Sequence, residues 1–244
     1  MIRVLVNGAK GRMGQEVVRA VQADAALQLA GEADMSDDLL AAIKAAEADV
    51  VVDFTVASSG FRNAELILQS GARPVIGTSG FKQDDVEKLQ KLAAQKQLGG
   101  VIAPNFAIGA VLLMKFSREA ARYMPDVEII ELHHDQKADS PSGTAIRTAE
   151  LIALERDKGK RGERVSEHAI IPGARGAELE QIRIHSVRLP GFVAQQQVIF
   201  GSKGQTLTLK HDSNHRESFM PGVCHACKAV MTQKELFYGL EHLL

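Results

Sequence analysis

A short apolar strand followed by evenly spaced glycines opens the chain and limits what it can fold into. Residues Ile2–Asn7 are apolar, and Gly8-Ala9-Lys10-Gly11-Arg12-Met13-Gly14 leads into an amphipathic helix that runs through Ala23. In a G-x-x-G-x-x-G loop the first glycine permits a tight turn, the second lets the backbone approach a pyrophosphate, and the third allows close helix packing. The pattern therefore favours a dinucleotide-binding strand–loop–helix unit, with Gly8 to Gly14 as candidate cofactor contacts.

Further strand and helix patterns alternate along the first hundred residues. Apolar runs indicate strands, and the segments between them have helical spacing at 60–70 and 84–96. Such alternation predicts an α/β fold with a doubly wound, Rossmann-like parallel sheet and ligands at the carboxyl ends of its strands. The expected strands are Leu27–Gly31, Ala48–Phe54, Pro74–Gly77 and Gly100–Ala103.

An acidic residue after the second expected strand is a candidate ribose ligand. Asp34 lies about 20 residues beyond the glycine loop, where such folds place a carboxylate that binds the ribose hydroxyls. Glu32 is an alternative ribose ligand, and either residue could instead be a solvated loop acid.

The organisation changes after Phe106. A long helical stretch covers 108–123, and four later runs read as strands, some with one wet and one buried face. These features predict a second α+β domain with a mixed sheet. The expected strands are Ala169–Ile171, Glu180–Val187, Gln195–Phe200 and Gln205–Lys210, and a final helix is expected over Cys224–Met231.

Composition narrows the class of protein. The net charge is -1 and the pI is near 6.7, which argues against nucleic acid as the main partner. No apolar run is long enough to span a membrane, and the N-terminus lacks signal-peptide architecture, so we expect a cytoplasmic protein.

Cys224 and Cys227 have no second pair to complete a zinc site, so we expect them to pack in the core. The basic run Lys158–Arg164 is expected to be a solvated loop.

The segment Glu128–Ala145 concentrates the chemistry of the chain. A strand pattern ends near His133, and Ser142 lies just before a helical stretch that begins near Thr144. The N–H groups and dipole of a helix start attract an anion. With His133 and Lys137 upstream, one loop offers a proton donor, a cation and an anion site, as acid catalysis on a small carboxylate requires.

This segment closely resembles the signature of the 4-hydroxy-tetrahydrodipicolinate reductase family, also called dihydrodipicolinate reductases. The signature is E-[IV]-x-E-x-H-x-x-x-K-x-D-x-P-S-G-T-A, and every fixed position is present here. The resemblance extends to the glycine loop, the Gly77-Thr78-Ser79-Gly80 turn and Ala103-Pro104-Asn105-Phe106. It implies an oxidoreductase that reduces 4-hydroxy-tetrahydrodipicolinate with NAD(P)H in diaminopimelate and lysine biosynthesis.

The resemblance also implies roles for individual residues of the segment. His133 would be the proton donor, and Lys137 would bind a substrate carboxylate and serve as a second proton donor. His134 would contact the substrate, while Ser142, Gly143 and Thr144 would hold the other carboxylate. Asp139 is expected to be structural, and to position the turn or pair with Lys137. A metal is not expected, because a neighbouring lysine repels a cation.

Cofactor contacts and domain boundaries follow from the same resemblance. It implies nucleotide contacts at Gly77, Thr78 and Ser79 and at Ala103, Pro104, Asn105 and Phe106, the last with a core position as the alternative. Met35 stands where some members carry an arginine that faces the 2′-phosphate of NADP, which slightly favours NADH over NADPH. Lys10 and Arg12 could still attract a 2′-phosphate, so use of both cofactors remains open. The expected domains are 1–106, completed by 215–244, for the dinucleotide, and 107–214 for the substrate and for assembly of a homotetramer.

Two other functions remain open at this stage. Another two-domain nicotinamide dehydrogenase would share the glycine loop without requiring the His133 and Lys137 segment. A non-catalytic dinucleotide sensor would keep the fold but would need neither residue.

Overall fold

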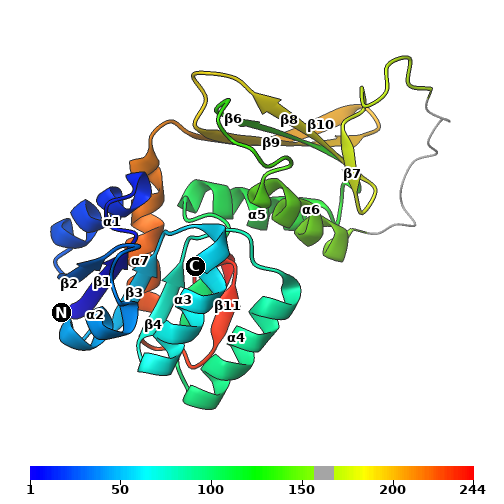
Figure 1. The fold of residues 1–244 in the computed structure, drawn as a ribbon. Coiled ribbons are helices and arrows are strands. Elements are labelled where there is room, and N and C mark those ends of the chain that lie inside the picture. The colour runs from blue at the N-terminus through cyan, green and yellow to red at the C-terminus, as the bar shows by residue number, and fades with distance from the viewer. Residues whose placement is uncertain (157–167) are drawn as a thin grey trace. The chain divides into compact units, whose positions relative to one another are not determined.

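The computed structural model describes residues 1–156 and 168–244, so the basic run Lys158–Arg164 lies outside the described residues (Figure 1). The chain forms two compact units, each of which has its own sheet. The first comprises Met1–Ile108 and Arg216–Leu244, and the second comprises Gly109–His215.

The first unit is built on a six-stranded parallel sheet. Its strand order is β11-β5-β4-β3-β1-β2. β2 lies on one side of β1, whereas β3 and the strands that follow it lie on the other side. The direction in which strands are added to the sheet therefore reverses between β1 and β3. At such a reversal the loops after the two central strands separate and leave room for a ligand. The strands are β1 (Ile2–Asn7), β2 (Leu27–Ala33), β3 (Val50–Asp53), β4 (Arg73–Ile76), β5 (Gly100–Ile102) and β11 (Leu236–Tyr238).

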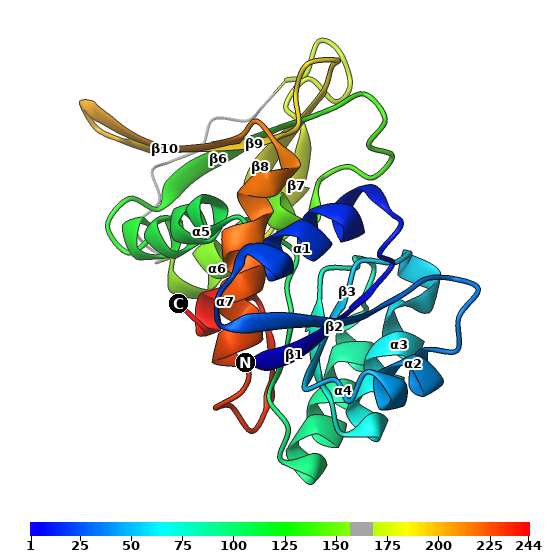
Figure 2. The same ribbon diagram turned by 90° about the vertical axis from the view of Figure 1, so that its left-hand side faces the viewer.

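Helices cover both faces of this sheet, as the expected doubly wound fold requires. The blue α1 and orange α7 pack side by side on one face (Figure 2), while α2, α3 and α4 lie on the other. Strand residues such as Val4, Val51 and Val75 are fully buried because both faces are covered. The helices are α1 (Arg12–Ala23), α2 (Leu39–Ala45), α3 (Ala57–Ser70), α4 (Gln83–Lys96), α7 (Met220–Ala229) and the short 3-10 turns η2 (Arg216–Phe219) and η3 (Leu240–His242).

Two features of the C-terminal segment differ from the sequence prediction. The last α-helix begins at Met220 rather than Cys224, because Pro221 occupies the first turn, where a missing N–H costs nothing. Leu236–Tyr238 forms the edge strand β11, which pairs with β5. The sequence analysis missed β11, because a segment this short forms a strand only when a neighbouring strand pairs with it.

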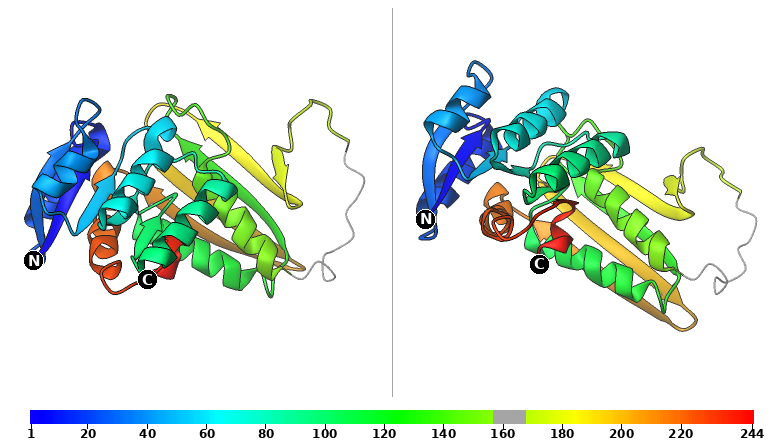
Figure 3. Two further views of the ribbon diagram at one scale, coloured as in Figure 1. Left: turned by 60° about the horizontal axis from the view of Figure 1, so that its bottom comes forward. Right: turned by 90° about the horizontal axis from the view of Figure 1, so that it is seen from below.

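The second unit combines a five-stranded mixed sheet with two helices. The strand order is β10-β9-β6-β8-β7, in which β6 pairs with β8 in parallel and β10–β9, β9–β6 and β8–β7 are antiparallel pairs. The helices α5 and α6 run along one face of the sheet (Figures 1 and 3). Their apolar side chains pack there against those of the sheet. The elements are α5 (Ile108–Ala120), β6 (Asp126–His133), α6 (Gly143–Glu155), β7 (Ala177–Leu179), β8 (Ile182–Arg188), β9 (Ala194–Ser202) and β10 (Gln205–Ser213).

One strand expected in this unit is absent. Ala169–Ile171 is not a strand, and both isoleucines are exposed. The run is followed at once by Pro172-Gly173, and Gly173 adopts a left-handed conformation in a turn. β7, at Ala177–Leu179, is the strand that pairs with β8 instead. None of the described helices is both long and apolar enough to cross a membrane.

Candidate active site

The glycine loop after β1 has the close packing that its spacing predicts. Gly8 adopts a φ of +82°, a conformation that side chains disfavour. A Cβ atom on Gly14 would lie 2.0 Å from the Gly8 carbonyl oxygen, so only glycine lets α1 start this close to the loop. Gly11 donates its N–H to that same oxygen and caps α1. The exposed loop residues Lys10, Gly11 and Arg12 border a helix start suited to an anion.

Asp34 lies against this loop. The residue follows β2 directly, and its carboxylate accepts hydrogen bonds from the backbone N–H groups of Lys10, at 2.9 Å, and Met35, at 2.8 Å. The Met35 and Lys10 N–H groups lower the pKa of Asp34, so it is ionised at neutral pH. Glu32, the alternative ribose ligand, is exposed and belongs to β2 itself. These contacts favour Asp34 over Glu32 as the ribose ligand, while its contact with a cofactor remains a prediction.

A buried carboxylate joins the loops that follow β1, β3 and β4, and the sequence analysis missed it. Asp53 is fully buried at the end of β3. Its Oδ2 accepts hydrogen bonds from Asn7, at 2.7 Å, and Asn63, at 2.9 Å, and its Oδ1 accepts from the hydroxyls of Thr55 and Thr78. A polar side chain is tolerated in the core only when it is this well hydrogen-bonded. The signal in the sequence was Asp53 itself, which lies at the end of the apolar run A-D-V-V-V-D-F. An aspartate is buried in such a run only when it has hydrogen-bond partners.

The predicted turns after β4 and β5 lie beside each other. Ala103 donates its N–H to the Ile76 carbonyl at 2.9 Å, and a Cβ atom on Gly77 would lie 2.1 Å from the Phe54 ring. Thr78 is buried and donates its hydroxyl hydrogen to Asp53, so only the backbone of Thr78 could contact a cofactor. Ser79 is exposed.

Beyond Ala103, Pro104 and Asn105 are half-buried, and the Asn105 side chain accepts a hydrogen bond from the Ala107 N–H. The Phe106 ring is only 1% exposed and packs against Phe54 with 5.8 Å between ring centroids. The side chain of Phe106 thus occupies the core position that was the alternative to a nicotinamide contact.

The second group of predicted residues lies on the loop from β6 to α6. Ser142 caps α6, and its hydroxyl accepts a hydrogen bond from the Ala145 N–H at 3.2 Å. The Ser142 side chain is therefore structural. Gly143 and Thr144 form the first turn of the helix, whose N–H groups favour an anion. Gly143 is exposed and has no side chain to keep a ligand from the backbone.

Lys137 pairs with Asp139 on this loop. The ammonium donates to both carboxylate oxygens, at 2.7 and 2.8 Å, as the sequence analysis allowed. Burial opposes ionisation of Asp139, but the hydrogen bonds from Lys137 outweigh it and lower the pKa of Asp139. The Lys137 side chain is 21% exposed and Asp139 is 64% exposed, so a ligand carboxylate can approach this pair from solvent.

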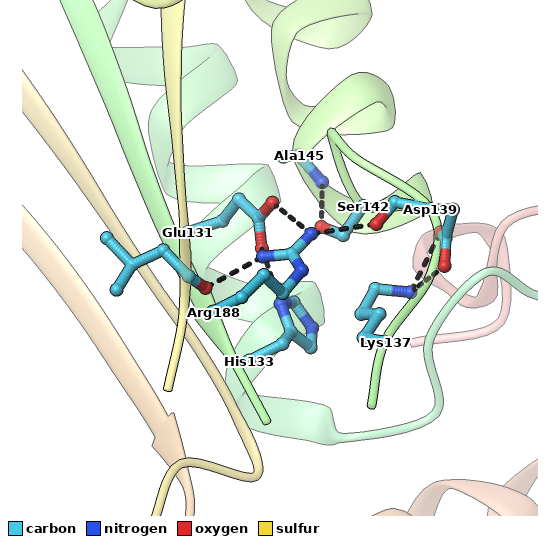
Figure 4. A network of polar contacts seen from close by, with 8 residues as sticks. Glu131, His133, Lys137, Asp139, Ser142, Ala145 and Arg188 are labelled. Carbon is cyan, nitrogen blue, oxygen red and sulfur yellow. Dashed lines mark hydrogen bonds and ion pairs between the residues drawn. The ribbon is translucent and has the colours of Figure 1, made fainter. Parts of the chain in front are cut away.

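The half-buried His133 belongs to a cluster with Glu131 and the half-buried Arg188, here called the Glu131 cluster (Figure 4). The Glu131 side chain is fully buried. It accepts two hydrogen bonds from the Arg188 guanidinium, at 2.8 and 3.0 Å, and contacts Nδ1 of His133. Burial opposes ionisation of Glu131, but the bonds from His133 and Arg188 lower its pKa to about 2. Glu131 is therefore a carboxylate at any physiological pH.

Arg188 also ties the cluster to the loop. In the register between β6 and β8, Arg188 is the partner of His133, and its guanidinium donates to the Asp139 carbonyl at 2.8 Å. Figure 4 shows His133, Lys137 and Ser142 around the connection between β6 and α6. The half-buried His134 follows His133 at the end of the strand. The sequence analysis assigned no role to Glu131 or Arg188, although the Glu131-x-His133 spacing places both side chains on one face of a strand.

The two cysteines have the environment expected of core residues. Cys224 and Cys227 are buried in α7 as free thiols, and burial raises the pKa of both. Within residues 1–156 and 168–244, no group of three or more His, Cys, Asp or Glu side chains is arranged to hold a metal ion.

Comparison with known proteins identifies the family. The family model "Dihydrodipicolinate reductase, N-terminus" matches residues 2–106, and "Dihydrodipicolinate reductase, C-terminus" matches residues 109–244. The chain belongs to the dihydrodipicolinate reductase family. Family membership confirms the resemblance stated from the Glu128–Ala145 segment, and it makes the chain an NAD(P)H-dependent oxidoreductase.

Individual relatives match over their whole length. The 4-hydroxy-tetrahydrodipicolinate reductase of Geobacillus kaustophilus is 50% identical, with 100% of this chain and 99% of the relative covered. The enzyme of the same name from Enterococcus faecalis is 49% identical, with both chains fully covered. The solved structure of dipicolinate-bound dihydrodipicolinate reductase from Paenisporosarcina sp. TG-14 has a TM-score of 0.86 and 44% identity, again with both chains fully covered.

Proposed function

We propose that this chain reduces 4-hydroxy-tetrahydrodipicolinate to tetrahydrodipicolinate with NAD(P)H, as a step in diaminopimelate and lysine biosynthesis. The observation that carries the proposal is the loop from β6 to α6, which combines the His133 imidazole, the Lys137 ammonium and a helix start. Relatives that carry this activity in their names are about half identical to the chain over its full length.

The first unit fits a dinucleotide. The contact between Gly8 and Gly14 leaves no room for a Cβ atom, and the N-terminus of α1 lies directly after the loop. The residues that would hold the cofactor are those of the glycine loop, Asp34 for the ribose, and the backbone of 77–79 and 103–106. When bound, the reduced nicotinamide supplies a hydride to the substrate.

Lys137 and the start of α6 would bind the two carboxylates of the substrate. Lys137 offers a cation that already holds one carboxylate, that of Asp139, in the structure. The first turn of α6 offers backbone N–H groups next to Gly143, where no side chain intervenes. Two anion sites of different kinds on one loop would orient a dicarboxylate and exclude compounds with a single carboxylate.

His133 would protonate the substrate. Once the 4-hydroxyl group of the substrate has left as water, arrival of the hydride at one carbon of the resulting conjugated ring leaves negative charge on the neighbouring carbon, which must then take a proton. An imidazole has the proton affinity suited to this task near neutral pH. Because Nδ1 of His133 contacts Glu131, Nε2 is the ring nitrogen that can deliver the proton. Lys137 would stabilise the developing charge and serve as the second proton donor.

Cofactor preference, assembly and location complete the proposal. We expect NADH to be favoured slightly, because the uncharged Met35 stands where an arginine would bind a 2′-phosphate. The Met35 side chain is 87% exposed. We also expect a homotetramer in the cytoplasm. The face of the second sheet opposite α5 and α6 carries partly exposed side chains such as Ile130 and Leu132, and a second copy of the chain could cover it.

An assay with freshly generated substrate tests the proposal. The purified protein should oxidise NADH, followed by the loss of its absorbance, only when 4-hydroxy-tetrahydrodipicolinate is present, and NADPH should support a somewhat lower kcat/KM. Oxidation with an amino acid or another oxo acid instead would favour a different nicotinamide dehydrogenase. Cofactor binding without turnover of any substrate would favour the sensor.

A further inference from the structure

We propose that Glu131 is a positioning residue that orients His133 for proton transfer and that Arg188 holds the two in place. The inference rests on the proposed function, because it concerns the residue that would be the proton donor there. It goes beyond that function by assigning roles to two residues that the sequence analysis left without one.

The geometry of Glu131 carries the first step. Its side chain is fully buried on the face of β6 that packs under the helices, and its carboxylate contacts Nδ1 of the His133 ring. An ionised carboxylate accepts hydrogen bonds and cannot donate one, so it requires the ring proton to be on Nδ1. In the imidazolium the second proton is then on Nε2, where it can be donated. After donation, the neutral ring keeps the Nδ1 proton and does not have to turn.

Arg188 provides the second step. Its guanidinium spans both oxygens of Glu131, in the bidentate geometry that fixes a carboxylate most firmly. The same guanidinium donates to the Asp139 carbonyl, in the loop that carries Lys137. Arg188 therefore couples the orientation of the imidazole acid to the conformation of the loop that would bind the substrate.

The sheet also contains a matched control. Glu128 lies on the opposite face of β6, where it contacts His185 at 2.8 Å and pairs with Arg175, so its partners are of the same residue types. We call these residues the Glu128 cluster. The Glu128 side chain is 38% exposed, and its histidine lies on β8 rather than at the end of β6 that leads to α6. Loss of this carboxylate removes the same kind of contact without touching His133.

The kinetic test compares Glu131→Gln with Glu128→Gln. Glutamine keeps the volume of Glu131 but removes its charge. Its amide NH₂ group also places a hydrogen-bond donor against one of the Arg188 N–H donors, so that hydrogen bond is lost. Glu131→Gln should lower kcat roughly 10- to 100-fold, with the KM for NADH unchanged, because an acid in the wrong orientation affects turnover and not nucleotide binding. Glu128→Gln should retain wild-type kcat. Wild-type kcat in a folded Glu131→Gln protein would overturn the inference.

The second test observes the ring itself and needs no change at Glu131. Protein labelled with ¹⁵N-histidine should give, once His133 is neutral, ring signals of the tautomer that is protonated on Nδ1. The signal is assigned through its loss in His133→Asn. A neutral His133 protonated on Nε2 would contradict the inference even if Glu131→Gln failed to fold. A wild-type protein that shows the Nδ1 tautomer but no reductase activity would instead overturn the proposed function and leave the orientation of His133 intact.

Discussion

The two faces of β6 carry clusters of the same three residue types in very different surroundings. On one face Glu131 contacts His133 and Arg188, and its side chain is fully buried. On the other face Glu128 contacts His185 and Arg175 and is 38% exposed. In the single chain, water reaches the second cluster and competes for its hydrogen bonds, whereas the fully buried Glu131 carboxylate has no such competitor. The two clusters contain the same residue types, so it is the burial of the glutamate and the position of the histidine that single out the Glu131 cluster as the candidate catalytic cluster.

The largest effect should come from the two histidines. His133→Ala should lower kcat roughly 10²–10⁴-fold, because a positioned proton donor contributes that much to turnover. His185→Ala removes the equivalent ring of the Glu128 cluster and should leave kcat close to wild type. Steady-state assays of NADH oxidation check both variants. Equal losses would break the comparison, and near-wild-type turnover by His133→Ala would remove this residue from the mechanism.

The pH dependence of stability should separate the two carboxylates. The folded-state pKa of Glu131 is about 2, below its ordinary value near 4.5. The ionised group therefore stabilises the fold above pH 4.5, and this stabilisation is lost as the pH falls from about 4.5 toward 2. The loss should be on the order of 3 kcal/mol in the free energy of unfolding.

Urea unfolding at a series of acidic pH values measures this effect. Glu131→Gln should flatten the dependence in that window because it removes the titrating group. Glu128→Gln should change it less, since the Glu128 cluster is partly exposed to solvent. A wild-type profile in Glu131→Gln would mean that folding does not lower the pKa of Glu131.

Two lysine–aspartate pairs with the same spacing extend the comparison. Lys137 pairs with Asp139, and Lys210 pairs with Asp212 on β10. Lys137→Ala should lower kcat and raise the KM for the dicarboxylate, with a combined loss in kcat/KM of about 10- to 100-fold, the size of one charge-assisted hydrogen bond. The KM for NADH should not change. Lys210→Ala is the control. Loss of NADH binding in Lys137→Ala would assign Lys137 to the nucleotide instead.

The smallest effect should come from outside both clusters. Met35→Arg adds a cation next to Asp34, where a 2′-phosphate would lie, and should shift the ratio of kcat/KM values about tenfold toward NADPH. It should leave the response to Glu131→Gln unchanged, because cofactor choice and proton donation belong to different units of the chain. An unchanged ratio for the two cofactors would refute the assignment of this position.

Much of the nucleotide unit could be predicted because its signals are local. Gly14 is a glycine because of a contact within its own loop, and the strands of the parallel sheet are continuous apolar runs. Ala169–Ile171 was predicted wrongly for the opposite reason. An apolar tripeptide becomes a strand only if another strand pairs with it, and the pairing in this region belongs to Ala177–Leu179.

The sequence by itself determined the family, the alternation of strands and helices, and the single loop that carries His133, Lys137 and the start of α6. All of these depend on residues that are close together along the chain. Only the tertiary structure brought Arg188 beside His133 and gathered Asn7, Asn63 and Thr78 around Asp53. Asn63 lies on α3, 10 residues from Asp53, but the other contacts join residues far apart in sequence that meet because parallel strands pair side by side. Burial then makes their hydrogen bonds strong, and burial is a property of the folded chain.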